Sequence, residues 1–253
     1  MPSIIKIWVI NRELAMLKTD KTFSKKCKRK AASDSKKAVL LLSGGLDSAT
    51  VLYYALSKGY DVFCISFDYG QRHRKELDCA RYLVKLNHSK WQLVRMSFPW
   101  KGGALLDKGV KLSQSRKITK TIPNTYVPSR NIIFLSYAAS YAEVIGADKI
   151  FIGTNQIDYS GYPDCRRSFL YAFEKAVNKG TRVGVNGEKI NIVSPLLLKN
   201  KKDIIDMGTK LGVPFEHTWS CYKGERYLCG RCDSCIIRKK GFYAAGIKDP
   251  LKR

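Results

Sequence analysis

The segment that most constrains the fold spans residues 37–59, KAVLLLSGGLDSATVLYYALSKG. Its apolar run KAVLLLS is typical of a strand that is covered on both faces. Two adjacent glycines, Gly44 and Gly45, then allow a tight turn. Apolar residues next recur at helical spacing up to Gly59, a typical helix C-cap. A strand, a glycine turn and a helix N-terminus in this order commonly bind an anion.

The polar residues of this turn indicate the kind of anion. The first N–H groups of the helix would point at a phosphate, and Ser43 and Ser48 add hydroxyl donors. Asp47 would repel a phosphate unless its carboxylate binds Mg²⁺. No Lys stands where the GxxxxGK[ST] loop has one, and the turn does not match GxGxxG either. We therefore predict a phosphate–magnesium site; the alternative is a plain turn in which Asp47 and Ser48 only cap the helix.

The rest of the chain alternates strands with helices. Periodicity predicts strands at 37–43, 60–70, 91–98, 147–158 and 189–196. It predicts helices at 46–59, 74–87, 129–146, 166–180 and 200–212. This order is typical of an α/β fold with an open, parallel, five-stranded sheet and right-handed crossovers. The long segment 99–128 is expected to be a functional or mobile loop.

Four of the eight cysteines gather near the C-terminus, as Cys221, Cys229, Cys232 and Cys235. The spacing C-x7-C-x2-C-x2-C lets four thiolates reach one ion, which favours a structural tetrahedral Zn²⁺ site. An iron–sulfur cluster or a redox pair is the alternative. Cys64 and Cys79 are expected in the core.

Composition and charge divide the chain into three parts. Residues 1–36 form a basic extension. The stretch 21–37 has few apolar residues and is expected to be a disordered arm; a transit peptide is the alternative reading. Residues 37–212 form the predicted α/β domain, and residues 213–253 the zinc-binding segment, which lacks a regular pattern. The net charge of +25 reflects either a solvated basic surface or an anionic partner such as a nucleic acid. No apolar run is long enough for a membrane helix, so we expect a cytoplasmic protein.

Several motifs together resemble a known family. SGGLDS is similar to the pyrophosphate loop (PP-loop) of ATP pyrophosphatases, enzymes that transfer AMP from ATP to a substrate oxygen. It is followed by DYGQRHRKEL, YVPSRNIIFLSYAASYAE, IGTNQIDYSGYPDCR, PLLLKNKKDIIDMGTKLGV and TWSCYKGERYLCGRCDSCIIRKKGF. In this order they resemble the 7-cyano-7-deazaguanine (preQ0) synthases of queuosine biosynthesis, over residues 37–250.

The resemblance implies an ATP-dependent C–N ligase that acts on a 7-deazapurine. In that reaction 7-carboxy-7-deazaguanine is activated by ATP, ammonia displaces the leaving group, and the amide is dehydrated to the nitrile. ATP, Mg²⁺ and Zn²⁺ are the implied cofactors, and a homodimer is the implied assembly. Direct nucleic-acid binding is not expected.

The resemblance and the residue chemistry suggest roles for individual side chains. Asp47 and Ser48 are expected to be catalytic, with Arg72, His73 and Arg130 neutralising phosphate charge. The predicted ATP-binding segment comprises Leu42, Ser43, Gly44, Gly45, Leu46, Asp47, Ser48, Ala49, Thr50, Val51 and Leu52. The predicted substrate contacts follow the fourth strand and are Asn155, Asp158, Tyr159, Asp164 and Arg166, the last able to hold a carboxylate bidentately.

Two other functions compete with this reading. One is a PP-loop enzyme that modifies tRNA directly, which the basic charge favours. The other is a nucleic-acid-binding protein with a zinc ribbon and a vestigial ATP site, which the intact Asp47 and Ser48 oppose.

Overall fold

A computed structural model describes residues 36–113, 121–157 and 161–251. These residues belong to one compact unit, which begins at Lys36. The basic extension predicted at residues 1–36 lies outside the described residues, apart from Lys36. No helix in the three described ranges has the length and apolar character that a membrane crossing requires.

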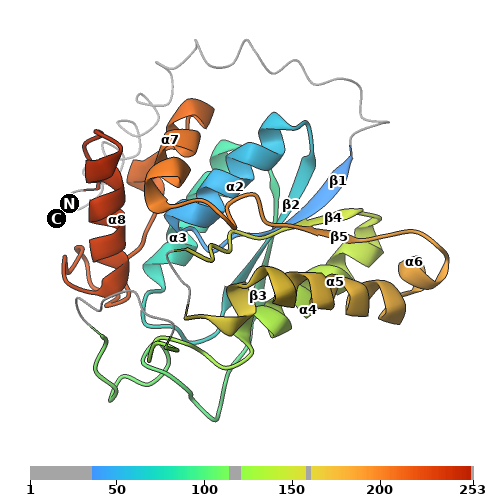
Figure 1. Cartoon of the computed structure of the whole chain (residues 1–253), viewed down its shortest axis with the longest axis horizontal. Helices are drawn as coiled ribbons and strands as arrows, with labels where there is room; N and C mark the ends of the chain where they lie inside the picture. The colour runs from blue at the N-terminus through green and yellow to red at the C-terminus, as the bar shows by residue number, and fades with distance from the viewer. Residues whose placement is uncertain (1–35, 114–120, 158–160, 252–253) are drawn as a thin grey trace, which may run out of the picture. The chain divides into compact units, whose positions relative to one another are not determined.

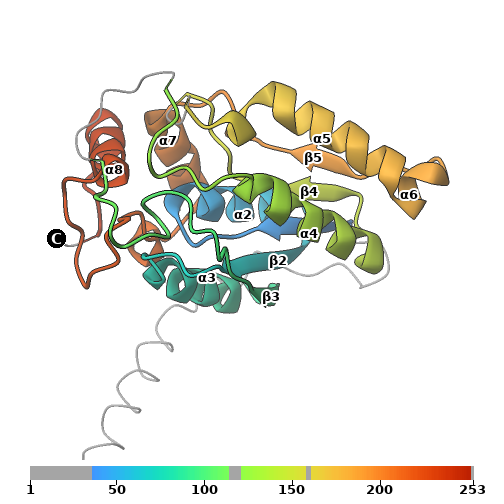
Figure 2. The same ribbon diagram turned by 90° about the horizontal axis from the view of Figure 1, so that it is seen from below.

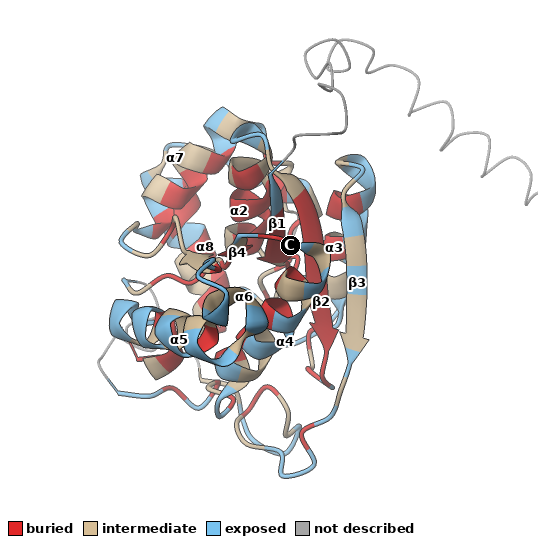
Figure 3. Ribbon diagram, turned by 90° about the vertical axis from the view of Figure 1, so that its right-hand side faces the viewer, coloured by how far each residue is buried: buried red, intermediate tan, exposed pale blue. Residues whose placement is uncertain are grey.

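Five parallel strands form the central sheet in the order β3-β2-β1-β4-β5, which confirms the predicted sheet (Figure 1). The strands are β1 (Lys37–Leu41), β2 (Asp61–Asp68), β3 (Lys90–Arg95), β4 (Lys149–Phe151) and β5 (Asn191–Val193). The last two are shorter than predicted. Figure 3 shows that β1 and β2 are buried along most of their length, whereas the edge strand β3 alternates between exposed and half-buried residues. Apolar runs in the middle of the sheet and mixed residues at its edge explain this order.

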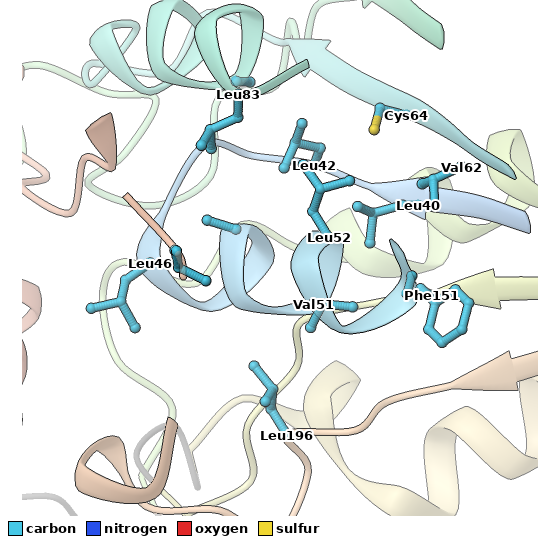
Figure 4. Packing of buried hydrophobic residues seen from close by; sticks show 14 of the residues in the cluster. Leu40, Leu42, Leu46, Val51, Leu52, Val62, Cys64, Leu83, Phe151 and Leu196 are labelled. Atoms are coloured by element: carbon cyan, nitrogen blue, oxygen red, sulfur yellow. The ribbon is translucent and has the colours of Figure 1, made fainter. Parts of the chain in front are cut away.

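One face of the sheet is covered by α2 (Leu46–Ser57), α3 (Lys75–Leu86) and α7 (Lys201–Leu211). Successive side chains of β1 point to opposite faces, so Leu40 turns toward these helices and Val39 away from them. Figure 4 shows Leu52 of α2 beside Leu40 and Leu42. This packing fixes the helix that follows the glycine turn against the strand that precedes it.

The opposite face is covered by α4 (Arg130–Ile145) and α5 (Arg167–Gly180), which Figure 2 shows on the near side of the sheet. Small residues of α4, among them Ala138 and Ala142, are fully buried and let the helix approach the strands closely. Between the two helices lies the 3₁₀ turn η1 (Pro163–Cys165), and α5 leads into the single turn α6 (Arg182–Val185).

The C-terminal segment contains a helix, which corrects the prediction that it lacks regular structure. After the 3₁₀ turn η2 (Phe215–His217), α8 spans Asp233–Ala244. The helix escaped notice because its buried positions include Ser234, Arg238 and Gly241, which form no apolar stripe. Arg238, only 2% exposed, joins α8 to both ends of the segment through Asp249, Thr218 and the carbonyl of Phe215.

Candidate active site

A cavity of about 240 Å³ opens at the carboxyl ends of β1, β2 and β4. Ligands of open α/β sheets gather at this edge because the loops that follow parallel strands meet there. The wall contains residues from the glycine turn, from α3, α4 and α7, and from the C-terminal segment. Its polar members are Ser43, Asp47, Ser48, Tyr69, His73, Glu76, Arg130, Asn131, Thr154, Asn155, Tyr162, Lys201, Ser220, Tyr222, Ser234 and Arg238.

The glycine turn is fixed by close backbone contacts. Gly44 has a φ of +88°, and a Cβ atom at this position would lie 2.0 Å from the carbonyl oxygen of Glu76. Only glycine fits there, because both the conformation and the space exclude a side chain. On the other side, a Cβ at Gly153 would lie 3.1 Å from the amide of Ser48. The turn is therefore held between α3 and the end of β4.

The hydroxyl groups of the turn satisfy its own backbone. Ser43 Oγ and Ser48 Oγ lie 3.0 Å apart. Gly45 N donates to Ser43 Oγ at 3.2 Å, and Gly44 N donates to Ser48 Oγ at the same distance. No side chain caps α2, so its first amide groups are available to a phosphate. The same phosphate could also replace the two hydroxyls as acceptor of the Gly44 and Gly45 amide protons. Both serines and the helix start lie where the sequence predicted a phosphate site.

Lys201 supplies the cation that the glycine turn lacks. It begins α7, and its Nζ lies 2.6 Å and 2.8 Å from the two carboxylate oxygens of Asp47. The side chain is 8% exposed, and its stem crosses α8 where Gly241 leaves room: a Cβ there would lie 2.4 Å from Lys201 Cγ. Sequence reasoning missed this residue. The available signal was a helix that starts with Asn200-Lys201 directly after β5, at the edge where ligands gather.

Arg130, which the sequence predicts to neutralise phosphate charge, lines the cavity and is held by neighbours of opposite or partial negative charge. Its Nη1 donates to Tyr69 Oη at 3.2 Å. Burial lowers the pKa of the guanidinium, but Tyr69, Tyr162 and Asp164 raise it by more, so the group keeps its charge. Asp164 does not line the cavity. Its Oδ2 accepts a hydrogen bond from the amide of Asn131, which fixes the first turn of α4 and thereby Arg130.

His73 and Glu76 form a buried pair beside the glycine turn. Nε2 of His73 lies 3.3 Å from Oε1 of Glu76, and the imidazole ring lies 5.5 Å from the ring of Tyr222. Nδ1 of His73 has no hydrogen-bond partner within the described ranges. Both residues line the cavity, but Nδ1 is closed off from solvent, so this nitrogen does not face the open space.

Other predicted residues lie elsewhere. Arg72 is not in the cavity wall, because its guanidinium donates to the carbonyls of Asp107 and Val110 in the loop that follows β3. Arg166 lines a separate surface depression with Gln156 and Tyr171. Asp158 and Tyr159 lie outside the described residues. Of the predicted substrate contacts, Asn155 lines the cavity. Tyr162 and Cys165, which were not predicted, line it as well.

The predicted ATP-binding segment is only partly at the cavity. Leu42, Ser43, Gly45, Leu46, Asp47 and Ser48 line it, whereas Gly44 faces α3. Ala49, Thr50, Val51 and Leu52 are fully buried in the core instead. The reason is geometric, because a helix presents only its first turn to a ligand at its N-terminus.

An aromatic wall that the sequence did not reveal closes the side of the cavity under α4. The rings of Phe67 and Phe134 are stacked at 3.9 Å with an interplanar angle of 3°. Tyr69 meets Phe134 edge-on at 5.4 Å. Such flat apolar surfaces suit the face of a heterocyclic base. Cys165 also lies in this wall, but burial raises the pKa of its thiol to about 12, so it is a poor nucleophile.

The four cysteines predicted to bind a metal converge at the start of α8. Their sulfur atoms all lie within 4.8 Å of one another, and Cys229 Sγ and Cys235 Sγ are 3.9 Å apart. Four thiolates around one Zn²⁺, with bonds of about 2.3 Å, place their sulfurs about 3.8 Å apart. A four-iron cluster would hold each thiolate on a different iron and spread the sulfurs further. The donor set therefore fits one tetrahedral ion.

Hydrogen bonds among the thiols of this cluster shift their pKa values in opposite directions. Hydrogen bonds with Cys232 and Cys235 lower the pKa of Cys221, and the bond with Cys221 raises the pKa of Cys232 to about 12. Four thiolates this close can all ionise only around a cation. Of the two cysteines predicted in the core, Cys64 is fully buried there, which confirms the prediction. The prediction is wrong for Cys79, which is half-buried and packs against the cysteine cluster.

Comparison with known proteins places the chain in a family. Residues 37–246 match the family described as queuosine biosynthesis protein QueC. The chain belongs to this family. A 7-cyano-7-deazaguanine synthase of Clostridium kluyveri is 53% identical over 220 residues, which cover 86% of this chain and 97% of that protein. A synthase of the same name from Thermoplasma volcanium is 52% identical over 86% of this chain and 90% of that protein.

Among solved structures, an NMN synthetase from Francisella tularensis is similar with a TM-score of 0.47. The two chains are 15% identical, and the match covers 85% of this chain and 79% of that one.

Proposed function

We propose that this protein is a 7-cyano-7-deazaguanine synthase, which converts 7-carboxy-7-deazaguanine, ammonia and ATP into the nitrile of queuosine biosynthesis. Membership of the family carries this conclusion, and the cavity supports it. A single cavity joins a phosphate-binding turn, a buried arginine, the carboxylate of Glu76 and an aromatic wall. These groups suit a nucleotide, the 7-carboxylate, ammonium and a planar base, respectively.

The phosphate end of the cavity would hold the ATP. The N–H groups at the start of α2 and the hydroxyls of Ser43 and Ser48 would donate hydrogen bonds to the phosphoryl oxygens. Asp47, one carboxylate among these donors, is the residue that would hold Mg²⁺, which neutralises phosphate charge when bound. Lys201 would then turn from Asp47 to a phosphoryl oxygen, since its Nζ already lies at this end.

The other end of the cavity would hold the deazaguanine. Its flat ring would lie on the wall formed by Phe67 and Phe134, and Arg130 would hold the 7-carboxylate. A carboxylate is a poor electrophile, because its leaving group would be oxide. Transfer of AMP supplies a good leaving group, and the amide oxygen needs the same activation before the nitrile can form. One cavity could therefore serve both steps.

The carboxylate of Glu76 would accept the proton that ammonium must lose before its nitrogen attacks. Glu76 and His73 line the cavity between the glycine turn and Tyr222. Nε2 of His73 lies 3.3 Å from this carboxylate and would help to hold it in place.

The decisive experiment is an incubation of the purified protein with ATP, ammonium and 7-carboxy-7-deazaguanine. Mass spectrometry should detect the nitrile, and AMP with pyrophosphate should accumulate. Tight, steeply salt-dependent binding of tRNA without nitrile formation would instead favour the tRNA-modifying function. The positive charge that favours tRNA binding is not confined to the N-terminal extension. Residues 36–253 contain 37 of the 46 basic residues and 18 of the 21 acidic ones.

Zinc at the four cysteines, a homodimeric assembly and a cytoplasmic location complete the proposal. Exposed apolar side chains on α4, with Tyr137 46% and Val144 80% exposed, offer a surface for a second copy of the chain. Metal analysis of the purified protein should find one zinc per chain, and light scattering should give twice the chain mass.

A further inference from the structure

The C-terminal helix contributes directly to the wall of the cavity. Ser234, Ile237 and Arg238 of α8 line it, and Gly241 packs on Lys201. These positions follow the i, i+3, i+4, i+7 spacing of one helix face. The N-terminal end of that face, Ser234, lies in the chain between Cys232 and Cys235, two members of the cysteine cluster.

Ser234 has a hydroxyl that the protein itself does not use. The residue is 6% exposed, and within the described ranges its hydroxyl has no hydrogen-bond partner. Its oxygen is not sealed from solvent, so a water molecule or a ligand in the cavity can reach it. Other hydroxyls of the cavity are engaged, as Ser43 is with Ser48 and Ser220 with Arg238.

The backbone around Ser234 adds an electrostatic reason for an anion. Ser234 lies in the first turn of α8, a helix of 12 residues whose N-terminus has no side-chain cap. The positive end of the helix dipole and the first amide groups therefore favour negative charge there. The neighbouring acidic residue, Asp233, accepts a hydrogen bond from Ser113 at 2.9 Å and does not line the cavity.

This end of α8 is tied to the glycine turn. Trp219 N donates to the carbonyl of Gly44 at 3.0 Å, and Trp219 Nε1 donates to the carbonyl of the metal-ligating Cys221 at 2.9 Å. One residue thus joins the turn that receives phosphate to the segment that holds the metal.

We propose that Ser234 and the N-terminus of α8 form a second phosphoryl-binding element, which contacts the pyrophosphate part of the nucleotide opposite the glycine turn. This inference rests on the proposed function. The metal site then does more than stabilise the tail, because Cys232 and Cys235 hold the serine between them in position. Pyrophosphate binding and metal retention are consequently coupled.

The test measures dissociation constants by calorimetry for Ser234→Ala, Ser234→Thr and the wild type. The ligands are magnesium pyrophosphate, a non-hydrolysable ATP analogue with a methylene group between the α- and β-phosphates, and 7-carboxy-7-deazaguanine. Ser234→Ala should bind the two phosphate ligands roughly ten- to a hundredfold more weakly, the loss expected for a hydrogen bond to a charged group. Ser234→Thr should restore binding. Ser57→Ala, the same change at an exposed hydroxyl of α2, should match the wild type.

Two outcomes overturn the proposal: unchanged phosphate affinity in Ser234→Ala, or a loss confined to 7-carboxy-7-deazaguanine. Metal content is measured on every variant. If Ser234→Ala loses its metal, the test is made on the wild type instead. Pyrophosphate should then slow the transfer of metal to a chromogenic chelator severalfold. If pyrophosphate gives no such protection, the coupling is contradicted. Nitrile formation by the wild type is assayed separately. Its absence would count against the proposed function, whereas its presence with normal phosphate binding by Ser234→Ala sinks this inference alone.

Discussion

The glycine turn and the C-terminal metal segment meet at one cavity but are built in opposite ways. The turn is contiguous: strand, glycines, serines and helix follow within residues 37–57, and each backbone requirement is visible in the sequence. The metal segment acts across the chain. Its Trp219 bonds to Gly44, and its Gly241 admits Lys201, which reaches Asp47 over 154 positions. A short motif can specify a binding surface, but its charge balance comes from remote elements.

The largest expected effect comes from breaking the metal segment. Cys232→Ser removes one of four thiolate ligands, and structural zinc contributes roughly 10–16 kcal/mol of apparent binding energy that folding depends on. We expect loss of zinc by mass spectrometry and loss of the near-ultraviolet signal of Trp219. Cys64→Ser, a buried cysteine outside the cluster, is the control and should keep its zinc. A Cys232→Ser protein that retains full metal would contradict the ligand assignment.

Breaking the glycine turn should have the converse pattern. Asp47→Asn keeps the shape of the side chain but removes the charge that pairs with Lys201 and would hold Mg²⁺. We expect nitrile formation to fall by roughly 10²–10³-fold, in line with the loss of one preorganised electrostatic group. Zinc content should stay close to that of the wild type, whereas the melting temperature should fall although the protein stays folded, because the buried charge of Lys201 loses its partner.

The control for this variant is Asp78→Asn, the same change on α3 outside the cavity wall. Asp78→Asn should keep full activity. If Asp47→Asn were equally active, Asp47 would have no role in magnesium or phosphate binding.

A smaller change tests the bridge between the two regions. In Gly241→Ala the new methyl group would lie 2.4 Å from Lys201 Cγ, so the lysine stem must move. Activity should drop about tenfold through displacement of Nζ from Asp47, while zinc stays bound. Gly246→Ala is the matched control after α8, where no atom lies within 4 Å of the added carbon, although its φ of +69° adds some strain. Equal activity of the two variants would show that Lys201 tolerates displacement.

The smallest effect is expected at the aromatic end, which neither region controls. Tyr69→Phe removes the hydroxyl that accepts from Arg130 but keeps the ring in its wall. A hydrogen bond to a charged group contributes about 1.5–3 kcal/mol, but Arg130 keeps the attraction of Tyr162 and Asp164. The KM for 7-carboxy-7-deazaguanine should therefore rise by up to about tenfold, with little change in the KM for ATP. A rise confined to ATP would reverse the assignment of the two ends.

The comparison also explains how far the sequence could lead. All five strands, the parallel sheet and the thiol cluster followed from patterns confined to short windows, such as KAVLLLS or CGRC. The helix α8 could not be predicted in this way, because its buried residues Arg238 and Gly241 contact Thr218 and Lys201 and form no apolar stripe.

Individual site residues divide along the same line. Ser43, Asp47 and Ser48 were predicted because one helix start presents them together. Lys201 and Ser234 were missed, since each reaches the cavity only after a strand order and a helix packing that no local pattern encodes. Arg72 shows the opposite error: its position at the end of β2 was predicted correctly, but its side chain turns to the carbonyls of the loop after β3.

The hydrogen bond between Trp219 and Gly44 has a consequence for the order in which the enzyme becomes functional during synthesis. Domains form from the N-terminus as the chain emerges from the ribosome. A nascent chain that had emerged only as far as β5 would possess every strand of the sheet and the whole glycine turn. It would lack Lys201, Trp219 and α8, which all line the same cavity. Firm nucleotide binding is therefore expected only after the last fifth of the polypeptide has emerged.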